Sequence, residues 1–201
     1  MSRRSLRRDE RGAAVMEFGL LVVPLCLVLL GFLDVGYQMY LRSTLQGALY
    51  DVARSAVVQN PNIGGTGTIE QRVSAAVRAR LAGLASNGDW DVEVASFDSY
   101  ARVDVPEKLI NDQNGNGEVD PGDCWVDLQP NGDHDTNPQR EGIGGADDIA
   151  MYTATMIVPR ILPMAGLAGF DPEYTIVVRA AVRNQPYANQ AVPPTACEPI
   201  P

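Results

Sequence analysis

Oxygen-bearing side chains recur between residues 112 and 123 at the spacing of a twelve-residue calcium loop. Carboxylate or amide oxygens stand at loop positions 1, 3, 5, 9 and 12, and position 7 offers a backbone carbonyl. Calcium takes about six to eight hard oxygen ligands, and Gly117 at position 6 permits the sharp turn that wraps them around one point. The predicted ligands are Asp112, Asn114, Asn116, Glu118, Asp120 and Asp123. The alternative interpretation is a solvated turn cluster without metal, because Asp, Asn and Gly favour turns by themselves.

A displaced copy of this pattern follows at a spacing of 15 residues. Its position 12 is Pro138, which has no side-chain oxygen to offer. A second ion would therefore need Glu141, Asp147 or Asp148 to complete its ligand shell. The candidate ligands of this second site are Asp127, Gln129, Asn131, Asp133 and Asp135.

The remaining chemistry-bearing residues do not form an enzyme motif. His134, the single histidine, lies in the second copy with only Cys124 near it in sequence. Transition-metal sites usually combine several His or Cys ligands, so we expect an exposed loop histidine. The sequence contains no Gly-x-Ser-x-Gly, no His-Glu-x-x-His and no phosphate-binding glycine loop, and we predict that the protein is not an enzyme.

The N-terminus joins a basic leader to a long apolar run. Five arginines precede Gly12, and the 21 residues from Ala13 to Leu33 contain one ionisable side chain, Glu17. That length crosses a bilayer, and the arginines predict a cytoplasmic N-terminus with the rest of the chain outside. A carboxylate in such a helix is costly and so marks a functional position. A cleaved secretory signal is disfavoured by the length of the run, whereas a plain membrane anchor stays open as an alternative.

This N-terminal pattern resembles the TadE-like pseudopilins of tight-adherence (Flp) pilus systems, and its leader resembles a type IV prepilin processing site. The residues that carry the resemblance are Arg11, Gly12, Glu17, Phe18, Pro24, Gly31, Asp34, Val35 and Gly36. The resemblance implies that a prepilin peptidase cuts after Gly12, which makes Ala13 the first mature residue and Glu17 the fifth. Glu17 would then pair with the freed α-amino group of Ala13, in the same chain or in a neighbour.

The same resemblance implies a structural or assembly subunit in the bacterial inner membrane, with its C-terminal domain in the periplasm or carried into the pilus. The implied partners are the prepilin peptidase, other pilins and pseudopilins, the pilus assembly platform and the membrane. The alternative function is a membrane-tethered, calcium-dependent binding or adhesion module, in which the acidic loop contacts a ligand.

Helical periodicity continues beyond the apolar run. Apolar residues at three- and four-residue spacing predict an amphipathic extension that ends near Asn60-Pro61, and Pro24 should kink or loosen the helix. Thr68 should cap a second helix that reaches about Leu84. The predicted strands are Asp89–Phe97, Tyr100–Val105, Ile149–Val158 and Tyr174–Arg183.

Together these elements predict an α+β fold of type IV pilin layout, with a long N-terminal helix packed on a small antiparallel sheet. The predicted boundaries are a leader at 1–12, the long helix at 13–60 with a transmembrane part at 13–33, a domain at 61–187 containing an acidic loop at 112–148, and a proline-rich tail at 188–201. The tail should be extended or mobile.

Cysteine positions bear on the tail. Cys26 falls inside the predicted membrane span, where it acts as a small apolar residue. Cys124 and Cys197 fall on the predicted outer side, where a disulfide persists. We favour a bond between them, which would tie the tail to the acidic loop, over two free thiols.

The net charge of −9 is concentrated in one segment. Residues 112–148 hold ten acids and one base, Arg140. Loss of the leader, with five arginines against Asp9 and Glu10, would leave about −12. This balance argues against nucleic acid and anionic lipid surfaces as partners.

Overall fold

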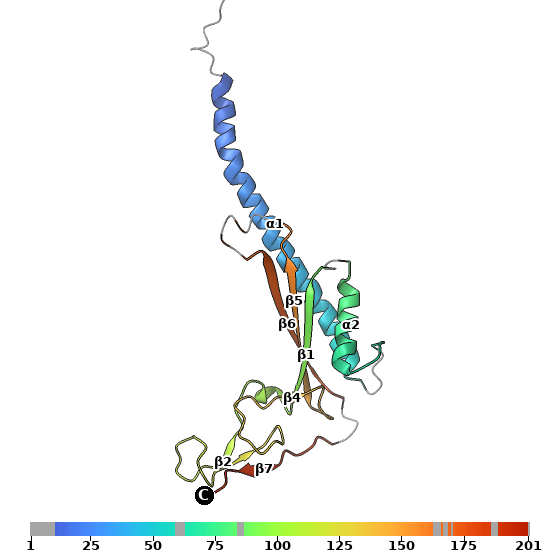
Figure 1. Cartoon of the computed structure of the whole chain (residues 1–201), viewed down its shortest axis with the longest axis vertical. Coiled ribbons are helices and arrows are strands. Elements are labelled where there is room, and N and C mark those ends of the chain that lie inside the picture. Colours follow the sequence, from blue (N-terminus) through green and yellow to red (C-terminus); the bar gives the residue numbers. More distant parts are fainter. Residues whose placement is uncertain are drawn as a thin grey trace, which may run out of the picture.

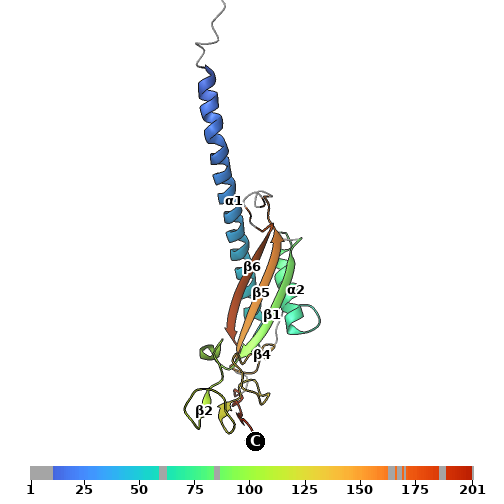
Figure 2. The same cartoon turned by 60° about the vertical axis from the view of Figure 1, so that its left-hand side comes forward.

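The N-terminal helix α1, Arg11–Ala56, has two halves with different surroundings (Figure 1). From Val15 to Leu33 most of its large apolar side chains are exposed, whereas from Leu41 to Ala56 one face of the helix is buried in the core. Its 46 residues correspond to a length of about 69 Å. The helix is continuous through Pro24, and Figures 1 and 2 show a gentle curve along its length. The long helix predicted from the sequence is thus confirmed.

The computed structural model describes residues 11–58, 63–83, 87–162, 166, 169, 171–185 and 189–200. The first ten leader residues lie outside this description. So do Asn60 and Pro61, where the sequence predicted the end of the long helix; within the described residues the helix ends at Ala56.

Helix α2, Ile69–Leu81, packs beside α1 and against strand β1 of the main sheet. Thr68 caps it as predicted: its hydroxyl accepts the backbone N–H of Gln71, and the Gln71 side chain accepts the backbone N–H of Thr68. This reciprocal pair satisfies two donors that the first helical turn leaves open. Val73 and Val77 are fully buried on the face toward α1 and the sheet. The helix ends before Leu84, its predicted end, which is outside the described residues.

The main sheet is antiparallel in the order β4-β1-β5-β6. Its strands are β1 (Asp89–Phe97), β4 (Arg140–Glu141), β5 (Ile149–Pro159) and β6 (Glu173–Arg183). Three of them match the predicted strands to within one residue at each end. Their inward residues pack with α1 and α2 in one hydrophobic core, so the α+β fold class with a pilin-like layout is confirmed.

The predicted strand Tyr100–Val105 is wrong. This segment forms a short 3₁₀ turn, η2 (Tyr100–Arg102), and Asp104 has a left-handed backbone with φ of 56°. Strand β1 has β5 on one side, and on the other side β4 pairs with Ala95 and Ser96, the end of β1 that a hairpin partner starting three residues later would meet first. A left-handed residue also breaks an extended run.

A second, smaller sheet of order β2-β3-β7 lies at the end of the molecule opposite the exposed half of α1 (Figures 1 and 2). Its strands are β2 (Leu109–Asn111), β3 (Cys124–Val126) and β7 (Thr195–Cys197). We call this sheet and the loops of residues 107–139 the distal lobe. Trp125 is 1% exposed and forms its core with Leu128. Because β7 pairs with β3, part of the proline-rich tail is an extended strand of this lobe.

Candidate functional site

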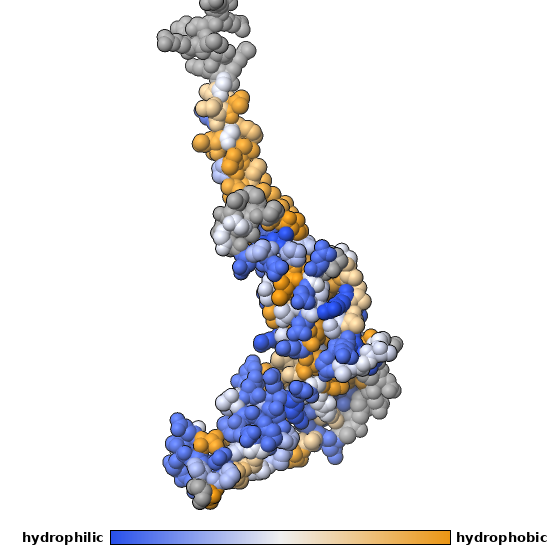
Figure 3. All heavy atoms as spheres, viewed as in Figure 1, coloured by the Kyte–Doolittle hydropathy of each residue, from blue (hydrophilic) through white to orange (hydrophobic). Residues whose placement is uncertain are grey.

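The exposed half of α1 carries the predicted processing residues. Gly12, Ala13 and Glu17 are all exposed on its first turns. Figure 3 shows hydrophobic residues along this part of the helix, in contrast to the hydrophilic distal lobe. By length and composition, α1 is the one helix among the described residues that could span a membrane.

Ala13 and Glu17 are four residues apart on a helix and therefore share a face. Within the described part of the chain the Glu17 carboxylate forms no hydrogen bond or ion pair, so the fold itself does not account for this charge-bearing side chain. A side chain added at Gly12 would meet no atom within 4 Å, so packing does not require glycine there either.

The first acidic loop, residues 112–123, closes around its own side-chain oxygens. The Asp112 carboxylate accepts the backbone N–H groups of Gly115 at 2.6 Å and Gly117 at 2.8 Å. The Asp120 carboxylate accepts side-chain amide N–H groups from Asn114 at 2.7 Å and Asn116 at 2.8 Å. Gly115 and Gly117 have φ of 71° and 78°, a left-handed backbone that favours glycine.

Asp123 closes this loop from its position 12. The residue is fully buried, and its carboxylate accepts the backbone N–H of Gln113 at position 2 and of Asp120 at position 9, both at 2.9 Å. A carboxylate with two backbone donors is well satisfied, which explains why a buried charge is tolerated here.

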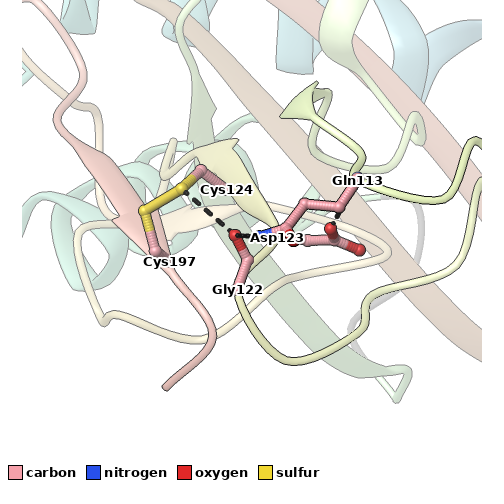
Figure 4. The surroundings of a disulfide bond; sticks show 5 residues. All are labelled: Gln113, Gly122, Asp123, Cys124 and Cys197. Atoms are coloured by element: carbon pink, nitrogen blue, oxygen red, sulfur yellow. Dashed lines mark hydrogen bonds between the residues drawn. A yellow bond between two sulfur atoms is a disulfide. The ribbon is translucent and has the colours of Figure 1, made fainter. Parts of the chain in front are cut away.

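The tail is fastened to the same loop. Cys124 and Cys197 form a disulfide in the structure, with Cα atoms 4.0 Å apart, and Figure 4 shows this bond next to Asp123. The backbone N–H of Glu198 donates to Asp123 O, and Gly122 N–H donates to Glu198 O, both at 2.9 Å. The structure thus brings together the two cysteines that the sequence analysis favoured as partners.

The second acidic loop repeats the pattern of the first. The Asp127 carboxylate accepts N–H from Gly132 at 2.9 Å, just as Asp112 does from Gly117 five residues later. The Asn131 amide donates to Asp135 at 2.9 Å, equivalent to the bond between Asn116 and Asp120. The 15-residue repeat in the sequence therefore corresponds to a repeat in local structure.

Glu107 closes this second loop, and sequence reasoning missed it. Its carboxylate accepts the backbone N–H of Leu128 at 2.5 Å and of Asp135 at 3.0 Å. These are positions 2 and 9 of the second loop, so Glu107 replaces the side chain that Pro138 lacks. Glu107 is 4% exposed. It precedes the loop by 20 residues, and no spacing motif could have identified it.

The acids expected to complete the second loop lie elsewhere. Asp148 forms an ion pair with Arg140 at 3.1 Å, and Asp147 forms one with Arg183 at 3.2 Å. Glu141 belongs to β4 at the edge of the main sheet. That expectation from the sequence is corrected: Glu107 takes the place assigned to these three residues.

His134 is half-buried rather than exposed, which corrects another expectation. Its Nε2 lies 3.0 Å from Glu107 O, and its ring packs edge-on against Trp125 with the ring centroids 5.6 Å apart. These contacts place the histidine in the packing of the distal lobe.

The donor set of both loops fits a hard cation in type and order. Within the described residues, no three His, Cys, Asp or Glu side chains converge to form a metal centre by themselves. A calcium loop, however, draws also on amide and backbone carbonyl oxygens, which both loops contain. An ion at the first loop would have to replace the amide N–H groups that now face the Asp120 carboxylate.

The electrostatics of the first loop favour its ionised form. The N–H of Gly117 lowers the pKa of Asp112 below its ordinary value, partial burial opposes this, and the N–H of Gly115 lowers the pKa further. Asp112 is therefore available as an anion, either for the backbone donors or for a cation.

Comparison with known proteins locates the resemblance in α1. Residues 12–54 match the family model described as TadE-like protein. No curated protein and no solved structure matches the chain. The resemblance predicted from the sequence is thus confirmed for the N-terminal helix, which is TadE-like, and the match ends before the sheet and the distal lobe begin.

Proposed function

We propose that this protein is a pseudopilin of a tight-adherence (Flp) pilus system, a structural or assembly subunit held in the bacterial inner membrane by the first half of α1. The observation that carries the proposal is the division of α1: its first half exposes apolar side chains and its second half is built into the domain core. Soluble domains rarely expose a continuous apolar surface of about twenty residues to water, whereas a bilayer or an apolar helix bundle would cover it. The TadE-like match over residues 12–54 supports the same function.

Processing by a prepilin peptidase after Gly12 is the second part of the proposal. Gly12 is exposed, and packing does not require a glycine there, so recognition by a peptidase can be the reason for this residue type. The cut would free the α-amino group of Ala13. Glu17, on the same helix face, would neutralise that amine, in its own chain or in a neighbour, and so remove an isolated charge from an apolar environment.

N-terminal sequencing and intact mass of the protein from pilus-producing cells test this step. The expected mature chain begins at Ala13, and the variant Gly12→Val should keep its leader. Gly19→Val is the matched control, because a side chain at Gly19 also meets no atom within 4 Å. Wild-type protein that retains its arginine-rich leader in these cells would refute the processing step and leave an ordinary membrane tether.

A second candidate function is supported by the paired loops: the distal lobe is a calcium-dependent binding or adhesion module. Both loops place carboxylates at equivalent positions, closed by Asp123 in one and Glu107 in the other. Calcium at the first loop would be held by Asp112, Asn114, Asn116, Asp120, Asp123 and the carbonyl of Glu118. The second loop would use Asp127, Gln129, Asn131, Asp135, Glu107 and the carbonyl of Asp133. A bound divalent ion would reduce repulsion among the carboxylates.

Calorimetric titration with calcium, together with melting temperatures in calcium and in chelator, tests the ion. We expect chelation to lower the melting temperature and Asp112→Ala to abolish the effect of the first loop. Glu118→Gln is the control, because it keeps the backbone carbonyl. Normal pili with lost surface attachment in Asp112→Ala cells would favour adhesion, whereas no heat and no shift with calcium would dismiss the module.

A further inference from the structure

One end of the main sheet lies where the exposed apolar half of α1 stops. Strand β6 runs beside α1 in the same direction: Tyr174 at its start contacts Asp34, and Arg179 O accepts an N–H from Gln46 at 2.8 Å (Figures 1 and 2). The two contacts are five strand residues and twelve helix residues apart, about 17 Å and 18 Å respectively. Because β5 is antiparallel to β6, it ends at Pro159 on the level of Asp34.

Three side chains lock this end of the sheet to the helix. Arg160 Nη1 lies 2.6 Å from Asp34 Oδ2, and its guanidinium stacks 4.4 Å from the centroid of the Tyr174 ring. The Tyr174 hydroxyl donates to the Asp34 carboxylate and lies 3.0 Å from Asp34 O. The side chains of Arg160 and Asp34 are 17% and 16% exposed. Asp34 is the first charged residue after Glu17, so this cluster marks the level at which the apolar half ends.

The chain leaves the sheet at this cluster and returns to it at the same place. Arg160 Nε donates to Asp171 O at 2.6 Å, and Arg160 N–H donates to Pro172 O at 2.9 Å. Ile161, the next residue, is 58% exposed. On the helix, Leu33 and Val35 on either side of Asp34 are 66% and 48% exposed. Exposed apolar side chains therefore adjoin the ion pair on both elements.

The composition of the connection between β5 and β6 fits this placement. The ten residues 161–170 include no Asp, Glu, Lys or Arg. The structure describes Ile161, Leu162, Gly166 and Gly169 of this run, and the inference is argued from Ile161 and its anchor at Arg160.

We propose that the Arg160 end of the sheet rests on the lipid surface, with Ile161 in the interfacial region of the bilayer. This contact is a second membrane attachment, which rests on the proposed insertion of α1 and continues its apolar surface. The anchor is suited to that level, because Tyr is enriched at the membrane–water interface and the Arg160–Asp34 pair carries no net charge. The acidic distal lobe is at the opposite end of the molecule, so its carboxylates stay away from the lipid headgroups when the Arg160 end touches the membrane.

Lipid quenching of a fluorescent label at position 161 tests the contact in the full chain. In a Cys26→Ser background the two remaining cysteines form the disulfide, so Ile161→Cys supplies a single thiol for an environment-sensitive dye. The protein is reconstituted at low density in phosphatidylcholine vesicles without nitroxide, or with a lipid that carries a nitroxide either on its headgroup, for position 161, or in the middle of an acyl chain, for position 25. Leu25→Cys, in the exposed half of α1, reports insertion, and Ile110→Cys, 53% exposed in the distal lobe, reports the aqueous control. Unchanged melting of each variant shows that the fold is kept.

We expect the label at position 161 to emit at shorter wavelength than the label at 110 and to lose most of its fluorescence to the nitroxide lipid. Quenching at 25 without quenching at 161 would overturn the surface contact and leave the proposed function intact. A label at 161 that shifts in wavelength but escapes quenching would indicate burial against a second copy, which also overturns it. Absence of quenching at 25 by the acyl-chain nitroxide would instead refute membrane insertion and with it the proposed function.

Discussion

Glu107 and Asp123 are equivalent closing residues of two successive loops. Each carboxylate accepts the backbone N–H groups at positions 2 and 9 of its loop, and each is buried; Glu107 also accepts the N–H of Gln129 at 3.4 Å. Asp123 comes from within its own loop, whereas Glu107 reaches the second loop from the segment that precedes β2. Two buried carboxylates therefore hold the loops of the distal lobe closed through backbone hydrogen bonds.

The first prediction concerns Glu107 in the second loop. Glu107→Gln replaces a carboxylate by an amide with one acceptor oxygen, so Leu128 N–H and Asp135 N–H cannot both keep equivalent acceptors. An unsatisfied buried donor costs about 1–3 kcal/mol, and we expect the free energy of unfolding to fall by that amount. Urea unfolding in chelator measures it without a contribution from calcium. Glu118→Gln, on the exposed rim of the first loop, should stay within about 0.5 kcal/mol of wild type. Equal stability of both variants would contradict the role of Glu107.

The acid that closes the second loop could not be predicted from the sequence. The pattern of the first loop is local, so residue spacing alone was enough to predict one ligand set: Asp112, Asn114, Asn116, Glu118, Asp120 and Asp123. The second loop lost its position 12 to Pro138, and its replacement depends on how the chain returns from β1, a tertiary fact with no local signal. Glu141, Asp147 and Asp148 are nearer to Pro138 in sequence, but Glu141 belongs to β4, and Asp147 and Asp148 form ion pairs with Arg183 and Arg140.

The disulfide leads to the second prediction. It joins residues 73 apart and holds β7 against β3. Closing a loop of this length restricts the unfolded chain, and we expect the double variant Cys124→Ser, Cys197→Ser to lose about 2–4 kcal/mol of stability. Urea unfolding and amide exchange at Trp125 and Ala196 provide the measurement. Cys26→Ser, in the exposed half of α1, should change neither, and an unaltered lobe in the double variant would count against the fastening of the tail.

Two buried tyrosines predict a loss of stability at alkaline pH. Burial raises the pKa of Tyr174 to about 12, with the hydrogen bond to Asp34 as the next cause, and burial also raises the pKa of Tyr152. Because the unfolded chain then loses these protons near pH 10 while the folded chain keeps them, the free energy of unfolding falls as the pH rises from about 10 toward 12. Chemical denaturation at several pH values over this range gives the slope of the unfolding free energy against pH. We expect this slope to be smaller in Tyr174→Phe and in Tyr152→Phe than in wild type. In Tyr50→Phe, whose side chain is half exposed, the wild-type slope should remain.

Long strands were easier to predict from the sequence than short ones. The alternation of Trp90, Val92 and Val94 marks β1, because one face of that strand is buried and the other is open. Strands β2, β3, β4 and β7 have two or three residues each, too few to show a period. The pairing of β2, β3 and β7 goes with the disulfide and the loop hydrogen bonds, and that of β4 with the edge of β1; composition encodes neither.

The fourth prediction compares two neighbouring residues in the second half of α1, the half that packs in the core. Leu49 is fully buried in the core, and the next residue, Tyr50, is 51% exposed. Leu49→Ala should lower the free energy of unfolding by about 2–5 kcal/mol, because it removes buried contacts and leaves a cavity. Tyr50→Ala should change it by about 0.5 kcal/mol or less. Urea unfolding in detergent measures both, and similar losses would mean that the helix packs with another face than the one described.

The last prediction separates processing from assembly at Glu17. In Glu17→Gln the side chain keeps its size and loses its charge, so a peptidase that selects Gly12 should still produce chains that begin at Ala13. The freed ammonium would then lack its counter-charge, and breaking a buried ion pair costs about 3–5 kcal/mol. We therefore expect mature protein of normal mass and a marked loss of surface pili, measured by intact mass and by the yield of sheared pili. Glu17→Asp keeps the charge and should restore part of that yield. Normal piliation in Glu17→Gln would show that no amine depends on this carboxylate, because an uncompensated charge in an apolar bundle could not leave assembly unchanged.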